Sequence, residues 1–479
     1  MNINQILKAV LAVFILVSVT VLQSCKKDDK DDPQPANPND YVNSWIISNM
    51  KEAYYWTDKL PASPNKSLDP EPFFESLLNK PDDKFSWIQE NYQDLLNSLQ
   101  GINKEAGYEF ALYYADNTQV NLVAQVLYIK KSSPAEAVGL KRGDVIDQIN
   151  NTQLTASNYQ TLLQQISENH SITYRPYNFV SNTIGASKTI SITTVEYSEN
   201  PNFLDKVISV NNRKIGYYVY TLFATGPSST STQYNDEMDA VFDRFKSAGI
   251  TDLVVDLRFN SGGAEAATVN LASLIGKSVD NTKVFAKREY NANLKQQILN
   301  DPTLGANFLL TKFTNKTQNV SSLLARNRVY VLTSARTASA SELLINGLKP
   351  YMEVFIIGNK TYGKNVGSIS IYEKSDPKNT WGMQPIVVKS FNSLDQSDYS
   401  TGFTPNILDL DNGAQYPLGD VNEKLLSLAN NNIINGGRVA ASEPSFGSFV
   451  GHSFDFKGRN MDLIIDSNFD NLVPTFSLH

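Results

Sequence analysis

Ser339 is the residue whose type and setting most directly suggest chemistry. It lies in residues 333–342 (TSARTASASE), where a predicted strand turns into a predicted helix. A hydroxyl at a helix N-terminus lies beside backbone N–H groups that have no partner in the helix, and these groups favour a developing oxyanion. The same spacing fits the S-x-x-E capping box, in which Ser339 and Glu342 only satisfy the first helical turn. Ser339 is therefore either a nucleophile or a helix cap.

Two further loops also follow predicted strands. Residues 256–263 (DLRFNSGG) end in paired glycines, which let a substrate approach the backbone closely and leave N–H groups free to point at it. Residues 359–367 (NKTYGKNVG) carry Lys364 in a glycine-rich turn, where a lysine is usually solvated. Each loop alone is weak evidence for a site. Neither contains the G-x-G-x-x-G or G-x-x-x-x-G-K-[ST] pattern of a nucleotide-binding loop.

The composition restricts the chemistry available to these loops. The 479 residues include only three histidines (His170, His452 and His479) and one cysteine, Cys25. A zinc site needs three or four converging ligands, and a Ser-His or Cys-His enzyme needs a well-placed imidazole. The net charge is −7 and no stretch is rich in Lys and Arg, which disfavours a nucleic-acid partner. We predict no metal, no organic cofactor and no nucleic acid.

The three loops are joined by an alternating pattern that begins near residue 205. The predicted strands are 215–222, 253–257, 328–333 and 353–358, and the predicted helices are 235–247, 264–275 and 338–348. Such alternation favours a parallel or mixed sheet with helices on its faces. Ligands of these sheets bind at the carboxyl ends of the strands, where all three loops lie. The loops are therefore expected to form one site.

The N-terminus is typical of an export signal. In residues 1–24 the only charge is Lys8, and the apolar run 9–22 is too short to span a bilayer comfortably. The run ends in LQSC, with Cys25 last, and resembles the lipobox of bacterial lipoproteins, in which the cysteine is acylated after cleavage. The resemblance implies an exported, lipid-anchored protein at the outer membrane, on its periplasmic or cell-surface side. An ordinary signal peptide with an incidental cysteine is the alternative. Residues 25–40, charged and proline-rich, are predicted to be a solvated tether.

Two smaller units precede the alternating region. Residues 41–98 are predicted to form a small helical domain, because apolar residues recur there at three- and four-residue steps. Residues 99–198 contain the segment 133–146 (SPAEAVGLKRGDVI), which resembles the signature of PDZ domains in bacterial proteases. The resemblance implies capture of a peptide C-terminus as an added strand, with its carboxylate bound by backbone N–H groups. The loop for that carboxylate would consist of Gly107, Tyr108, Glu109 and Phe110. A PDZ-like fold that only packs is the alternative.

Taken together, the three loops resemble those of the C-terminal processing (tail-specific) serine peptidases. That family carries D-L-R-x-N-x-G-G, S/T-A-S-A-S-E and T-x-G-K motifs in this order, and the resemblance covers roughly residues 105–435. It implies an α/β catalytic domain over 199–440, a crotonase-like mixed sheet flanked by helices. The family's nucleophile and general base fall on Ser339 and, 25 residues later, Lys364. Residues 441–479 remain an unassigned extension.

The implied Ser-Lys dyad agrees with the scarcity of histidine, because it needs none. The lysine must be neutral to act as a base, and at an ordinary pKa of about 10.4 roughly one in 2,500 is neutral at pH 7. Burial can lower a lysine pKa to about 7–8. The resemblance places the oxyanion on the backbone N–H groups of Ala340 and of Gly262 or Gly263. Glu342 either orients the base or caps the helix.

We therefore predict a lipid-anchored serine endopeptidase whose PDZ domain recruits the C-termini of proteins or peptides. Two other functions are consistent with the pattern. A non-catalytic relative on the same fold would bind apolar ligands and would need neither Ser339 nor Lys364. A PDZ adaptor would hold a partner protein at the membrane and would not depend on Ser339.

Overall fold

The computed structural model describes residues 38–228, 230–412, 415–436, 447–453 and 463–464. The predicted signal peptide, Cys25 and most of the predicted tether lie outside these residues. In the ranges described, no helix is both long enough and apolar enough to cross a membrane.

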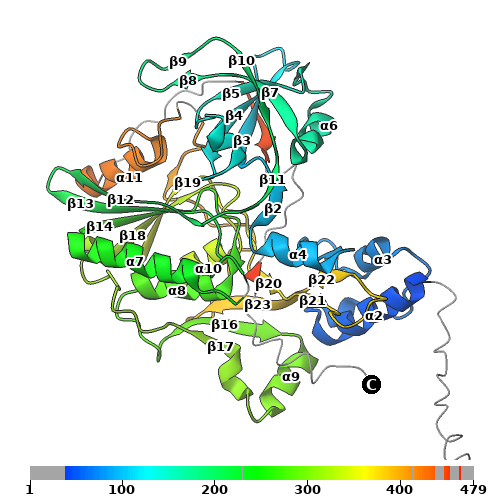
Figure 1. Cartoon of the computed structure of the whole chain (residues 1–479). Coiled ribbons are helices and arrows are strands. Elements are labelled where there is room, and N and C mark those ends of the chain that lie inside the picture. Colours follow the sequence, from blue (N-terminus) through cyan, green and yellow to red (C-terminus); the bar gives the residue numbers. More distant parts are fainter. Residues whose placement is uncertain (1–37, 229, 413–414, 437–446, 454–462, 465–479) are drawn as a thin grey trace, which may run out of the picture.

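A six-stranded sheet forms the centre of the molecule, in the order β12-β13-β14-β18-β19-β24 (Figure 1). Its strands are β12 (Asn202–Val210), β13 (Arg213–Tyr220), β14 (Asp252–Asp256), β18 (Arg328–Thr333), β19 (Glu353–Gly358) and β24 (Ile407–Leu408). All neighbouring pairs run parallel except β12 with β13. The prediction of a mixed sheet is confirmed.

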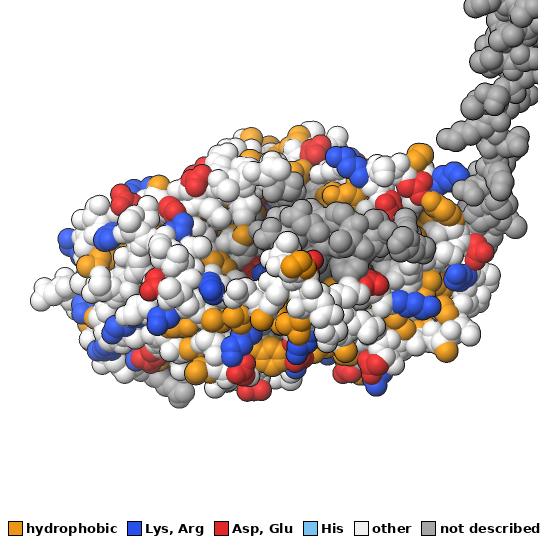
Figure 2. Space-filling model, turned by 90° about the horizontal axis from the view of Figure 1, so that it is seen from below, with side chains coloured by type: hydrophobic (Ala, Val, Ile, Leu, Met, Phe, Trp, Pro, Cys, Tyr) orange, Lys and Arg blue, Asp and Glu red, His pale blue; other side chains and the backbone are white. Residues whose placement is uncertain are grey.

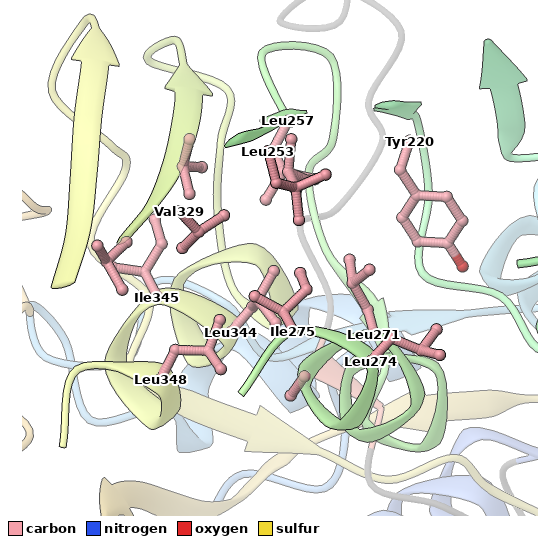
Figure 3. Close-up of a cluster of buried hydrophobic side chains, with 14 of the residues drawn as sticks. Tyr220, Leu253, Leu257, Leu271, Leu274, Ile275, Val329, Leu344, Ile345 and Leu348 are labelled. Carbon is pink, nitrogen blue, oxygen red and sulfur yellow. The ribbon is translucent and has the colours of Figure 1, made fainter. Parts of the chain in front are cut away.

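Helices cover both faces of this sheet. They are α7 (Gln233–Ala248), α8 (Glu265–Ile275) and α10 (Ala340–Leu348) on one face and α11 (Lys424–Asn435) on the other. Along β14, Leu253 and Val255 contact the first group and Val254 the second, as the alternation of side chains in a strand requires. Figure 3 shows Leu253 directed toward Leu344 of α10 and Ile275 of α8. Burial of each such side chain stabilises the folded state by about 1.5–3 kcal/mol relative to leaving it exposed.

A second sheet, which the sequence pattern did not predict, lies beyond α8 and α10. Its order is β15-β26-β20-β23-β16-β17. The strands are β15 (Gly263–Ala264), β26 (Leu463–Ile464), β20 (Val366–Ser368), β23 (Ile386–Asn392), β16 (Val284–Tyr290) and β17 (Leu310–Lys312). Thus the loop that carries Lys364 joins the central sheet, which it leaves at β19, to the second sheet, which it enters at β20.

The N-terminal unit is helical as predicted but has no core of its own. Its helices are α2 (Pro38–Ala53), α3 (Pro70–Leu77) and α4 (Tyr92–Leu99). The buried residues of α2 and α3 form one cluster with Leu294 of α9 (Ala292–Asn300) and Val387 of β23. The short strand β1 (Trp87–Gln89) also pairs with β22 (Gly382–Gln384). The unit is therefore part of the same folded body as the second sheet.

The PDZ-like unit is a sheet in the order β10-β7-β5-β4-β3-β25. Its strands are β10 (Lys188–Ile192), β7 (His170–Arg175), β5 (Val145–Ile149), β4 (Leu122–Ile129), β3 (Tyr108–Tyr114) and β25 (Phe449–His452), and α5 (Pro134–Ala137) and α6 (Tyr159–Gln164) pack against it. The last strand comes from the C-terminal extension. On the face of the molecule seen in Figure 2, basic and acidic side chains of the described residues are interspersed, without a continuous patch of either sign.

Candidate active site

The turn between β18 and α10 holds Ser339 in an unusual backbone conformation. Ser339 has φ 59° and ψ −114°, outside the regions that non-glycine residues normally adopt. Such a residue costs about 1–3 kcal/mol and persists only when its surroundings impose it. Here Ser334 Oγ donates to Arg258 O at 2.6 Å and Thr337 Oγ1 donates to Leu257 O at 2.9 Å, which fastens the turn to the loop after β14. Strain of this kind makes Ser339 a candidate functional residue.

The Ser339 side chain is buried at the N-terminus of α10. Ser339 and Glu342 are arranged as in a capping box. The Ser339 Oγ itself nevertheless makes no hydrogen bond to any described residue. The adjacent Ala340 is the first residue of the helix, so its N–H has no partner within the helix. A hydroxyl and a backbone donor are thus adjacent at the positive end of the helix dipole.

The buried carboxylate of Glu342 joins the serine turn to the lysine loop through hydrogen bonds. Its Oε2 accepts the N–H groups of Ser339 at 2.9 Å and of Lys364 at 2.8 Å. Its Oε1 accepts the Thr361 hydroxyl at 2.6 Å and the Gly363 N–H at 2.7 Å. Burial raises the pKa of Glu342, and the four donors oppose that shift because they stabilise the carboxylate. The carboxylate therefore caps the first turn at Ser339 and also binds the backbone of the lysine loop, whereas its role in orienting a base stays a prediction.

Lys364 is buried, with 1% of its surface exposed. Its Nζ lies 4.9 Å from the ring centroid of Phe85, a residue of the N-terminal unit. The preceding Gly363 has φ 104°, and a Cβ there would lie 2.6 Å from the carbonyl oxygen of Ser400. Only glycine fits this turn without distortion. The lysine is thus enclosed by packing from two parts of the chain and is not a solvated surface residue.

The two glycines after β14 differ from each other in their contacts. The Gly262 N–H donates to Asn260 Oδ1 at 2.9 Å, so it is already used, and the prediction that it could hold an oxyanion receives no support from this geometry. Gly263 begins β15 and lies beside Phe223, whose carbonyl oxygen would be 2.1 Å from a Cβ at position 263. Phe223 bonds to Gly262 O and Ala264 N and so leaves the Gly263 N–H unused, which makes Gly263 the better placed of the two candidate donors.

Asn260 is a site residue to which the sequence reasoning assigned no role. Its Nδ2 donates to Tyr220 O at 3.0 Å, and its Oδ1 accepts both the Gly262 N–H and, at 3.1 Å, the Ser341 hydroxyl. It therefore connects the glycine loop to the first turn of α10. The D-L-R-F-N-S-G-G motif contained the signal, because an asparagine directly after a buried strand commonly satisfies a turn through its side chain.

Arg258, in the same motif, is structural. It is 1% exposed and pairs with Asp256 at 2.8 Å, Asp411 at 2.8 Å and Glu423 at 2.5 Å. Arg142, from the PDZ-like unit, also reaches Glu423 at 3.3 Å. This cluster joins β14, α11 and the PDZ-like unit.

The predicted carboxylate loop of the PDZ-like unit differs from expectation. Gly107 has the positive φ of a turn (84°), but Tyr108, Glu109 and Phe110 lie in β3 and are buried. The Phe110 N–H donates to Ser453 Oγ at 3.0 Å, and the Ser453 hydroxyl donates to Glu109. These residues therefore form a strand rather than an open loop, because β3 is paired on both sides, with β4 and with β25.

A cavity of about 690 Å³ lies where the three units meet. Its lining includes Asn97 from the N-terminal unit, Lys130 from the PDZ-like unit, and Gly263 and Arg336 from the catalytic loops. Lys130 is held by Glu105 at 2.8 Å and Glu199 at 3.0 Å. In the described part of the chain, no group of three or more His, Cys, Asp or Glu side chains is arranged to hold a metal ion. The glycine loop, Ser261 to Gly263, lines part of this cavity.

Comparison with known proteins agrees with this arrangement. The model of peptidase family S41 matches residues 214–407, that of the peptidase S41 N-terminal domain matches 41–87, and a PDZ domain model matches 125–175. A crystal structure of a candidate S41 protease from Bacteroides fragilis superposes with a TM-score of 0.65 at 26% identity, over 82% of this chain and 97% of that one.

Curated relatives are more distant in sequence. A protein named as a CtpA-like serine protease of Staphylococcus epidermidis is 21% identical over 376 residues, which is 74% of this chain and 64% of the relative. A carboxyl-terminal-processing protease of Picosynechococcus is 24% identical over 328 residues, 66% of this chain and 67% of the relative. This chain therefore spans less than two thirds of the length of the staphylococcal protein. The chain belongs to peptidase family S41 and carries a PDZ domain and an S41 N-terminal domain.

Proposed function

We propose that this protein is a serine-type endopeptidase of the C-terminal processing kind, with Ser339 as nucleophile and Lys364 as general base. The observation that supports the proposal is the Glu342 carboxylate, which accepts the backbone N–H groups of both residues and so joins the serine turn to the lysine loop. A pure binding protein would require neither this carboxylate nor the strained serine. Homologous members that are named proteases support the same conclusion.

The proposed reaction has two halves. Lys364 Nζ takes the proton of Ser339 Oγ as the oxygen attacks the peptide carbonyl carbon, and the N–H groups of Ala340 and Gly263 stabilise the oxyanion. The lysine then gives the proton to the leaving amine, which departs as the acyl-enzyme forms. Water, deprotonated by the same lysine, then attacks the acyl carbon. The lysine returns that proton to Ser339 Oγ as the C–Oγ bond breaks, and the acyl group leaves as a carboxylic acid. The cycle requires the Lys364 amine in its neutral form.

Export, acylation of Cys25 and anchoring at the outer membrane belong to the same proposal and rest on the sequence. Recruitment of substrates by the PDZ domain is also proposed, with an incoming peptide bound as an additional strand of its sheet.

The nucleophile is tested by a fluorophosphonate probe. We expect the probe to label the wild-type chain at Ser339, as mapped by mass spectrometry, and to fail on Ser339→Ala and Lys364→Ala chains. Ser228→Ala, which removes an exposed serine, is the matched control and should label normally. Equal labelling of the Ser339→Ala chain would exclude this serine and favour the binding or adaptor functions.

Glu342 is expected to be a positioning residue. Glutamine at this position keeps one acceptor oxygen and places an amide NH₂ against backbone donors, so we expect kcat to fall about 10²-fold with KM changed by less than about 3-fold. The measurement is steady-state peptide hydrolysis, together with the rate of fluorophosphonate labelling as a function of pH. Glu353→Gln, at a half-exposed carboxylate paired with Arg328, is the control. A lower melting temperature with an unchanged kcat and pH profile would show that Glu342 only caps the helix.

A further inference from the structure

Two parts of the C-terminal extension lie as strands against other units of the molecule, one on the PDZ-like sheet and one beside the glycine loop. The first is β25, which pairs antiparallel with β3, with Phe449 opposite Tyr113 and His452 opposite Ala111. The pairing continues beyond the strand, since Tyr114 N donates to Ser448 O at 3.0 Å. In Figure 1 this segment is the red strand beside β3.

The docking of β25 has the form of a PDZ–peptide complex. The segment completes the sheet at an edge of β3 and runs toward Gly107, so it has the direction of a peptide added by β-augmentation. Val450 packs against the PDZ core, as a ligand side chain in a specificity pocket does. Beyond the strand, Ser453 bonds to Phe110 N and to Glu109. A buried glutamate there repels a carboxylate and accepts a hydroxyl, so the edge suits an internal segment.

The second part is β26, which lies between the glycine loop and the strand after Lys364. It pairs parallel with β15, with Leu463 opposite Gly263, and parallel with β20, with Ile464 opposite Ser368. Gly262 O and Ala264 N both bond to Phe223, so the peptide groups of Gly263 face the other side, toward β26. The extension therefore covers the better placed of the proposed oxyanion donors.

We propose that residues 447–453 and 463–464 act as a tethered peptide ligand that fills the PDZ edge and the strand position beside Gly263, and so competes in cis with peptide substrates. Competition between this segment and substrates rests on the proposed function, whereas the binding of the segment to the two sheets does not. A segment tied to the same chain has an effective concentration of about millimolar, so a substrate must displace it to reach Gly263. The alternative is that the two strands are permanent parts of the sheets.

A reversible lock tests the competition. The chain has one cysteine, so Ala111→Cys with His452→Cys in a Cys25→Ser background introduces a single pair of opposed thiols. Directly opposed residues in an antiparallel pair lie at a separation that a disulfide can span. Oxidation is expected to lower the hydrolysis of an added peptide at least about 5-fold, and dithiothreitol should restore it. The chain with Ala111→Cys alone is the control, and its hydrolysis rate should not change on oxidation or on addition of dithiothreitol.

Occupancy is tested without any need for hydrolysis. In a Ser339→Ala background, a chain that ends at residue 446 should bind a fluorescent peptide of residues 447–464, measured by anisotropy, whereas a chain that ends at 464 should bind it at least about 10-fold more weakly. Circular dichroism establishes whether both chains are folded. If the shorter chain is not folded, the disulfide experiment on the full-length chain tests the proposal instead.

The outcomes separate the two proposals. Equal peptide binding by the two chains, an oxidised pair that hydrolyses as fast as the reduced one, or failure of the pair to cross-link would each overturn the tethered ligand. If the shorter chain binds the peptide selectively but no chain that retains Ser339 hydrolyses any peptide, the tethered-ligand proposal stands and the peptidase proposal is rejected.

Discussion

Replacement of Lys364 by methionine is expected to lower kcat for peptide hydrolysis by about 10³–10⁴-fold, with KM changed by less than about 3-fold. Methionine retains an unbranched apolar side chain of similar length and removes only the amine. A general base contributes about 10²–10⁴ to the rate, and a serine hydroxyl without an adjacent base is a weak nucleophile. Because Lys364 is buried against Phe85, the apolar replacement is expected to fold.

The measurement is steady-state hydrolysis of a fluorogenic peptide by chains of equal thermal stability. Lys360→Met is the matched control, since Lys360 belongs to the same loop but is exposed, and it should retain full activity. A Lys364→Met chain that keeps more than about a tenth of the wild-type kcat would remove the lysine from the mechanism and require another base near Ser339.

Replacement of Arg258 by leucine is expected to lower the free energy of unfolding by about 3–5 kcal/mol, because removing one partner of a buried ion pair leaves charges uncompensated. Three carboxylates surround this guanidinium: those of Asp256, Asp411 and Glu423. Arg142 remains near Glu423 but compensates only part of the negative charge.

Urea denaturation followed by circular dichroism measures this loss. Arg244→Leu is the control, because Arg244 pairs with Asp205 at 2.9 Å while 56% of its side chain is exposed, and such a surface pair contributes about 0–1 kcal/mol. Equal losses in the two variants would show that the buried cluster has no special role in stability.

Much of the architecture could be predicted from the order of motifs and the alternation of strands and helices. The strand Arg328–Thr333 and the strand Glu353–Gly358 were predicted with the bounds observed. These strands are buried on both faces and are therefore mostly apolar in sequence. A short, nearly continuous apolar run of this kind predicts a buried strand from the local sequence alone. All strands of the second sheet were missed. Four of them have only two or three residues and carry no period of their own, but β16 and β23 have seven residues each and were not recognised either.

The site residues fall into two groups for the same reason. Ser339 and Lys364 stand in recognisable local motifs, so their nomination needed only sequence, although their roles remain proposals. The four hydrogen bonds of Glu342, the use of the Gly262 N–H by Asn260 and the positive φ of Ser339 were not predicted. Each depends on contacts between loops that are distant along the chain.

The sequence by itself determined the class of fold, the three loops at the carboxyl ends of strands and the two residues that would exchange a proton. It could do so because strand alternation, helix starts and short motifs are local properties of the chain. Only the tertiary structure decided that one carboxylate holds both loops, that Glu109 lies in a strand, and that the unassigned extension supplies β25 and β26. Pairing between strands hundreds of residues apart is set by which edges remain open after the rest has folded, and no local pattern records it.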